Sequence, residues 1–189
     1  MTNKRTFLLI SILFILSGIA GLIYQVTWFK QLSYFIGNST YAQSILLATF
    51  MGGLAAGSWY WGKKADTSKN TLRIFGILEI SIAVYCYFYQ PIFDSLNYLF
   101  TQFVMTNELS TDSTTVFIAR LVVSCLAILP PTILMGGTLP ILVRHFSVKI
   151  NEVGRNISML YFLNSLGAVV GTVIAGFYLL EKLGLRGTT

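Results

Sequence analysis

Glu79 is the residue whose type and setting most favour chemistry, because it is a carboxylate inside a long apolar stretch. A carboxylate near the middle of a membrane is costly and rarely faces lipid. Three uses are therefore open: a proton relay, a cation ligand, or one half of an ion pair. The competing interpretation is a structural carboxyl group that its neighbours satisfy.

Three more polar residues in apolar stretches are candidates for binding a substrate with Glu79, namely Gln25, Arg120 and Asn164. Arg120 is a candidate ion-pair partner, but it lies near the outer end of its stretch, whereas Glu79 lies nearer the middle or the inner half. A direct pair would need helix tilt or the full length of the arginine side chain. The alternatives are an Arg120 side chain that snorkels outward and an Asn164 that packs, or hydrogen-bonds, between helices.

Backbone breakers gather in one apolar stretch, where Pro130 and Pro131 are followed by Gly136, Gly137 and Pro140. Helix breaks at membrane depth are tolerated where neighbours or water satisfy the freed backbone groups, and they often line the substrate sites of transporters. A packing kink against the glycine-rich stretch that follows is the alternative.

Glycine spacing indicates where helices approach each other closely. Gly53 and Gly57 are four residues apart, as are Gly167 and Gly171, so each pair opens one helix face for packing in lipid. Asp66 follows the first pair, after an aromatic belt and two lysines. It is either a solvated loop residue or a charge contact with a neighbouring helix end, which could hold or gate the inner face.

The composition indicates an integral membrane protein. The chain has 189 residues, of which 54% are hydrophobic and only 11% are charged, and its mean hydropathy is +0.70. A soluble domain is usually about one quarter charged. The net charge of +6 is explained by orientation in a membrane rather than by nucleic acid, because the basic residues flank apolar stretches. Cys86 and Cys125 lie in apolar stretches and show neither disulfide nor metal-ligand spacing.

These patterns predict an all-α, polytopic transmembrane bundle that forms a single domain over residues 1–189. Five spans are expected, at about residues 7–29, 41–62, 72–89, 116–143 and 157–180. Pro91 should end or bend the third span, so that residues 92–103 form either an interfacial helix or its outer extension. Residues 181–189 look like the turn before a further helix, which suggests a fragment or a shortened form and leaves room for a sixth span.

Charge sets the expected orientation. With the amino terminus inside, nine basic residues fall at the inner ends of the spans and three at the outer ends, as the positive-inside rule requires. The expected location is a bacterial-type inner (plasma) membrane with a cytoplasmic amino terminus.

No nucleotide-binding, metalloprotease or redox motif occurs, since the chain lacks a strand-linked GxGxxG, a Walker loop, an HExxH and a CxxC. We therefore name no catalytic residue, no metal site and no cofactor.

Four stretches together resemble one family: SGIAGLIYQVTWFKQLSYFIGNSTYA (17–42), FMGGLAAGSWYWGKKAD (50–66), LPPTILMGGTLPILVRH (129–145) and LYFLNSLGAVVGTVIAGFYLLEKLGLRGT (160–188). The pattern resembles the membrane-embedded amino-terminal region of spermidine-synthase-like membrane proteins. That region is itself similar to half of a major facilitator superfamily transporter. Its GxxxxGxxxD-like pattern falls on Gly57, Gly62 and Asp66, although the arginine and second glycine usual after the aspartate are replaced within residues 67–70.

The resemblance implies a partner domain as well as a fold. In that family a soluble aminopropyltransferase-like domain typically follows the helices, and it would bind decarboxylated S-adenosylmethionine and a polyamine. Aminopropyltransferase activity is thus expected only of a longer protein that carries such a domain.

Three functions remain open from the sequence. The first is binding or transport of a small cationic solute, such as a polyamine, at Glu79. The second is anchoring of a polyamine-synthesising domain. The third is a structural membrane scaffold that oligomerises through its glycine faces. The expected interaction partners are the lipid bilayer and either a second copy of this chain or a second transporter-like half.

Overall fold

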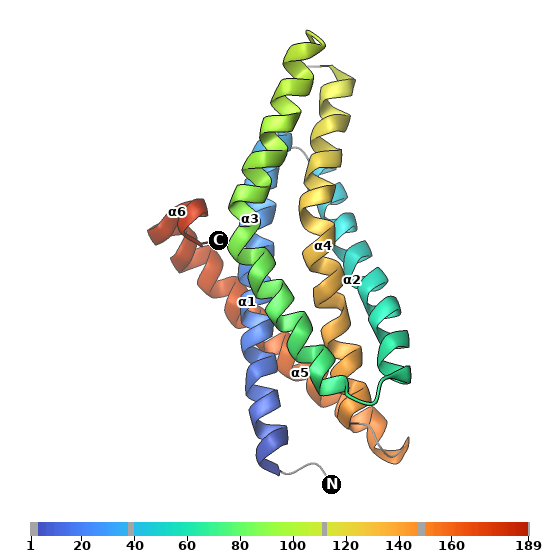
Figure 1. Cartoon of the computed structure of the whole chain (residues 1–189). Helices are drawn as coiled ribbons and strands as arrows, with labels where there is room; N and C mark the ends of the chain where they lie inside the picture. Colours follow the sequence, from blue (N-terminus) through green and yellow to red (C-terminus); the bar gives the residue numbers. More distant parts are fainter. Residues whose placement is uncertain (1–3, 38–39, 111–112, 147–149, 189) are drawn as a thin grey trace.

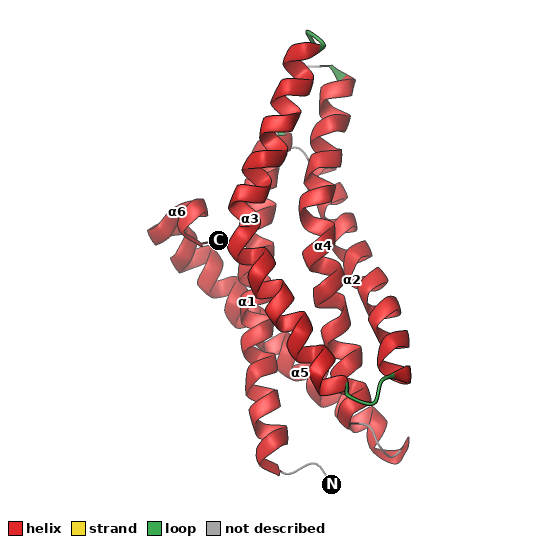
Figure 2. Ribbon diagram, in the orientation of Figure 1, coloured by secondary structure: helices red, strands yellow, loops and turns green. Residues whose placement is uncertain are grey.

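The computed structural model describes residues 4–37, 40–110, 113–146 and 150–188, and these residues form helices with no strand among them (Figures 1 and 2). The elements in order are α1 (Lys4–Ile36), α2 (Thr40–Thr67), α3 (Thr71–Thr106), α4 (Thr114–Phe146), α5 (Ile150–Ile174), the π-helix η1 (Ala175–Leu179) and α6 (Leu180–Thr188). The expected all-α bundle is confirmed.

Four stretches of helix are long and apolar enough to cross a membrane: Leu8–Ile36, Thr71–Thr106, Thr114–Phe146 and Gly154–Leu185. Only 17–33% of the most apolar part of each stretch is buried inside the bundle. Helices that are apolar on the exposed face as well as on the buried face need lipid rather than water around them. The chain therefore has the character of an integral membrane protein. Helix α2 is not among the four, because glycine, serine and its aromatic belt dilute its aliphatic residues.

The long helices run alternately up and down, and α5 crosses the others obliquely (Figure 1). The start of α1, the α2–α3 turn and the end of α4 lie at one end of the bundle, and the end of α3 and the start of α4 project at the other (Figure 1). The first end carries these basic residues: Lys63, Lys64, Lys69, Arg73, Arg144 and Arg155. Lys149, which was counted with them, lies outside the described residues. We name this first end the inner end and the opposite end the outer end, after the orientation expected from the sequence.

Helices α2 and α4 pack through glycines on both partners. A side chain added at Gly57 would collide with the backbone of Ile133, and one at Gly136 would collide with the backbone of Leu54. A side chain added at Gly53 would instead collide with the side chain of Thr132. Because neither helix presents a bulky side chain at these points, the two backbones come into contact and gain dispersion energy over a long interface.

Helices α1 and α5 pack in the same way. Gly167 lies against Ile15, and Gly171 lies against Ile19 one turn further along. Gly18 on α1 faces the backbone of Asn164 on α5, where an added Cβ would lie 2.7 Å from the carbonyl oxygen. The sequence predicted close packing at these glycines; the structure adds which helix each one meets.

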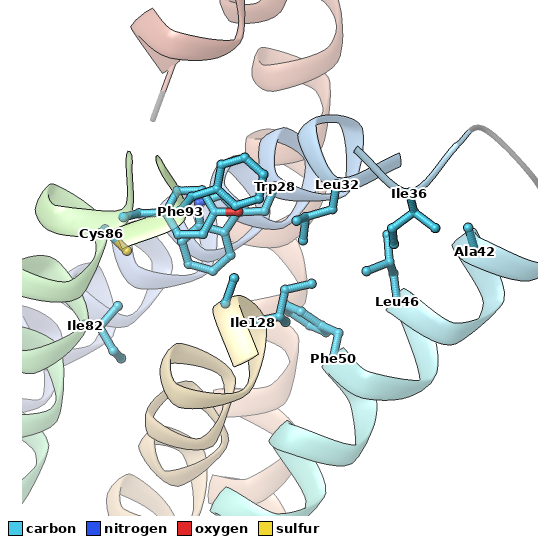
Figure 3. Packing of buried hydrophobic residues seen from close by; sticks show 12 residues of the cluster. Trp28, Leu32, Ile36, Ala42, Leu46, Phe50, Ile82, Cys86, Phe93 and Ile128 are labelled. Atoms are coloured by element: carbon cyan, nitrogen blue, oxygen red, sulfur yellow. The ribbon is translucent and has the colours of Figure 1, made fainter. Parts of the chain in front are cut away.

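Large side chains fill the space that the glycine contacts leave. The outer half of the bundle is filled by a cluster that includes Trp28, Leu32, Phe50, Phe93 and Ile128, drawn from four helices (Figure 3). The inner half holds a second cluster built around Phe14, Phe75, Leu78, Ile141 and Leu160.

The helices are longer and less interrupted than the sequence indicated. Helix α3 continues through Pro91 to Thr106, so residues 92–103 are the outer extension of the third span and not a separate interfacial helix. Helix α4 also runs unbroken through Pro130, Pro131 and Pro140, and the expected helix break there was wrong. The loop expected after residue 62 is short, since α2 ends only at Thr67.

Candidate functional site

Glu79 is held by a serine of the neighbouring helix. The Ser17 hydroxyl of α1 donates a 2.8 Å hydrogen bond to Oε1 of Glu79 on α3. Glu79 is half-buried and lies eight residues, or ~12 Å, along α3 from its inner end. The carboxylate is thus inside the apolar thickness of the bundle, with a neutral donor as its partner.

A second polar group approaches the same level from α5. Asn164 faces Gly18, the residue after Ser17, and its Oδ1 would lie 3.0 Å from a Cβ placed on Gly18. Glu79 and Asn164 therefore approach one turn of α1 from α3 and from α5. The structure brings these two predicted residues to a common layer, with α1 between them.

Arg120 does not join this layer. Its guanidinium group lies over the ring of Phe100, 5.7 Å from the ring centroid, in the outer part of the α3–α4 hairpin. Its Nε atom is buried without a hydrogen-bond partner. The Glu79–Arg120 ion pair that the sequence left open is therefore absent from the structure.

Gln25 also stands apart from Glu79. It is half-buried on α1, two turns beyond Ser17, and its side chain has no polar partner among the described residues. The structure gives Gln25 no direct part in the Glu79 layer.

The second proline of the α4 pair is compensated from α3. Pro131 has no N–H to offer to the carbonyl of Ala127 four residues earlier, and the Tyr85 hydroxyl donates a 2.9 Å hydrogen bond to that oxygen instead. Thr132, which follows the prolines, donates to the carbonyls of Ile128 and Leu129, both at 3.0 Å. The Tyr85 hydrogen bond replaces the donor that Pro131 lacks, and α4 continues where the sequence indicated a break. Pro130 is exposed and Pro131 is buried.

The inner ends of the helices carry a charge contact. Arg144 Nε on α4 lies 3.7 Å from Oδ1 of Asp66 on α2, and both side chains are largely exposed. This is the neighbouring helix end that one interpretation of Asp66 required. The pair borders an open groove of about 500 Å³ whose lining also includes Ser58, Gly62, Pro140 and Ile157.

A second contact ties α3 to the same end of α4. The Thr71 hydroxyl lies 3.0 Å from Nδ1 of His145. The inner end of α4 is thus linked to α2 through Arg144 and to α3 through His145. The contacts fasten the inner ends of three helices together.

Sequence reasoning missed two partners. Neither Ser17 nor Tyr85 was singled out from the sequence as a site residue. A signal existed for both, because Ser17 and Glu79, like Tyr85 and Pro131, lie at helical spacings that put them on inward faces. Choosing the partner helix needed the tertiary structure.

No three His, Cys, Asp or Glu side chains of the described residues come together to hold a metal ion. The chain matches no protein-family model, and comparisons with curated proteins and with solved structures found no match.

Proposed function

We propose that this chain is a membrane domain with five crossings that binds a small cation at Glu79. Helix α2 is the crossing that adds to the four apolar stretches. It packs along α4 through the glycine contacts, so it spans the same depth of the membrane as α4. The amino terminus is cytoplasmic, in a bacterial-type inner membrane, because the basic residues gather at that end of the bundle. The half-transporter arrangement and the possible second half, or second copy, rest on the resemblance of residues 17–42, 50–66, 129–145 and 160–188.

One observation carries the cation site: the Glu79 carboxylate lies within the bundle and, among the residues that the structure describes, has a hydroxyl donor but no basic partner. A buried carboxylate that lacks a counter-charge either takes up a proton or attracts a cation. The apolar stretches 121–143 of α4 and 157–180 of α5 contain no Lys, Arg or His. One cation from outside the chain would therefore neutralise the negative charge of this site.

The resemblance to spermidine-synthase-like membrane proteins makes a polyamine the first solute to test. Anchoring of a polyamine-synthesising domain rests on that resemblance alone. Oligomerisation through Gly53, Gly57, Gly167 and Gly171 is less favoured, because α4 and α1 of the same chain already occupy these faces.

Binding of radiolabelled spermidine to purified protein in liposomes tests the proposal. We expect Glu79→Gln to weaken binding by about tenfold or more, since it removes the one counter-charge. Glu181→Gln is the matched control, because Glu181 is an exposed acidic residue on α6. Equal binding by the Glu79→Gln variant and by the wild type would remove Glu79 from the function.

A further inference from the structure

Helices α1 and α3 meet along a seam of large side chains rather than through glycines. The two helices run in the same direction, and side-chain contacts join them at successive turns. We call this the α1–α3 seam, and its pairs from the inner to the outer end are Phe14–Phe75, Ser17–Glu79, Tyr24–Cys86, Trp28–Tyr89, Gln31–Gln90 and Phe35–Phe93. The α1 members recur at alternating steps, mostly of three and four residues, which keeps one face of the helix on its partner.

The outer part of the seam is a chain of hydrogen bonds that begins at the surface. Gln90 donates to Oδ1 of the exposed Asp94 at 3.0 Å. Gln31 in turn donates to Oε1 of Gln90 at 3.3 Å. The remaining polar atom, Oε1 of Gln31, is buried without a hydrogen-bond partner. The hydrogen-bonded groups thus lead from Asp94 to Gln31, and they end at an acceptor atom, Gln31 Oε1, that has no donor.

The next turn inward contains two more unsatisfied groups. Trp28 and Tyr89 stack with their ring centroids 4.6 Å apart, and both side chains are 0% exposed. The indole Nε1 and the phenol oxygen have no hydrogen-bond partner. An unpaired buried polar group costs about 1–3 kcal/mol, so three of them on adjacent turns favour bound water, which satisfies such groups in protein interiors.

The seam then continues toward Glu79 through a polar pair and an open space. The Tyr24 hydroxyl lies close to the Cys86 thiol. One turn further inward, Gly21 occupies the seam face of α1, and nothing lies within 4 Å of where its Cβ would be. Ser17 and Glu79 follow on the next turn. The space beside Gly21 therefore falls between the last outer polar pair and the carboxylate.

We propose that the α1–α3 seam holds a file of water molecules that carries protons between the outer surface at Asp94 and the Glu79 carboxylate. The path covers 14 residues of α1, from Gln31 to Ser17, or ~21 Å. A hydronium ion at the surface releases a proton to the first water, each water passes one O–H proton on as it receives another, and the last proton bonds to a Glu79 oxygen. No electrons are transferred, and the carboxylate becomes neutral.

This inference rests on the proposed function, because the path ends at the proposed cation site, Glu79. It adds that the proton is the ion that reaches Glu79 from outside. The groups that face Glu79 support this choice. Ser17 is neutral, and the nearest titratable group on α1 is Tyr24. The apolar stretches 121–143 of α4 and 157–180 of α5 contain no charged side chain. The proton on Glu79 therefore has no competing ion within the bundle.

Hydration of the seam can be measured without any transport assay. The indole N–H signals of ¹⁵N-labelled protein in lipid nanodiscs are followed after transfer to D₂O, with Trp28 assigned through Trp28→Phe and the exposed Trp59 as the fast reference. We expect the Trp28 N–H to exchange well before the backbone amides of its own helix turn, because water reaches it. If Trp28 exchanges as slowly as those amides, the seam is dry and the proposal is overturned.

The route is tested by filling the space beside Gly21. Protonation of Glu79 after an external pH jump is followed in liposomes by its infrared carboxyl band, identified as the band that Glu79→Gln lacks. We expect Gly21→Leu to slow protonation by about tenfold or more, because it interrupts the file and raises the barrier. Gly21→Ser adds a hydroxyl in the same space and should stay close to the wild-type rate.

Gly52→Leu is the control, because Gly52 on α2 also has nothing within 4 Å of an added Cβ but lies off the seam. An unchanged rate in Gly21→Leu, equal slowing in the leucine and serine variants, or a Glu79 band that never responds to external pH would each overturn the path. Spermidine binding still decides the cation site separately, so the two proposals can fail independently.

Discussion

The Tyr85 hydroxyl donates a 2.9 Å hydrogen bond to the carbonyl oxygen of Ala127, the acceptor that Pro131 leaves without its helical donor. A side chain of α3 therefore completes the backbone hydrogen bonding of α4. In lipid no solvent can do this, so the contact belongs to the structural framework of the bundle.

Tyr85→Phe should lower the stability of the folded protein by about 1–3 kcal/mol, because it leaves the Ala127 carbonyl unpaired in an apolar setting. Unfolding in mixed detergent micelles, followed by circular dichroism, measures the change. Tyr87→Phe is the control, since Tyr87 is 80% exposed. Equal transition midpoints for the two variants would show that the hydrogen bond adds no stability.

Gly57→Ala should destabilise the protein, because the added methyl group meets the backbone of Ile133, which cannot move aside as a side chain can. Gly52→Ala, five residues earlier on the same helix, should be neutral or stabilising by about 0.5–1 kcal/mol, as alanine is the better helix former where space is open. Detergent unfolding of the two variants checks both signs. Matching losses of stability would contradict the α2–α4 packing.

Asp66→Asn should change stability by no more than about 1 kcal/mol, because exposed ion pairs are screened by water and salt. A double-mutant cycle with Arg144→Gln, performed at low and high salt, measures the coupling between the two charges. We expect a small coupling that shrinks as salt is added. A large coupling that is independent of salt would mean that the pair is buried in the intact membrane assembly.

The five-crossing topology predicts the side from which single cysteines react. In a Cys86→Ala, Cys125→Ala background, Asn70→Cys should react with a membrane-impermeant maleimide only from the cytoplasmic side. Thr40→Cys and Asn107→Cys should react only from the outer side. Labelling of intact cells and of inverted vesicles gives the answer. If the probes at positions 40 and 70 react from the same side, α2 does not cross the membrane.

The sequence was sufficient to predict the class of fold, but not whether each helix continues through its prolines. Apolar length and low charge predicted a helical bundle in lipid, and the four apolar helices agree with this. The prolines were misjudged, because a proline's effect on a membrane helix depends on whether a neighbour supplies the missing donor. Tyr85 supplies one, and it lies 42 residues away from Ala127 in the chain.

The candidate site shows the same division. The cost of a carboxylate in lipid singled out Glu79, a property of one residue and its immediate surroundings. Its role in binding a cation stays a prediction. Its partner Ser17 lies 62 residues away, and Arg120, the charge-based choice, lies elsewhere in the bundle.

The amino-acid sequence by itself determined the apolar stretches, the end of the bundle that gathers basic residues, and the glycines that allow helices to touch, because these follow from transfer free energies and spacing along one helix. Only the tertiary structure decided that α2 meets α4, that α1 meets α5, and that Glu79 meets Ser17. Such pairings depend on how each helix is rotated and tilted against all the others, which is a property of the packed bundle and not of any single segment.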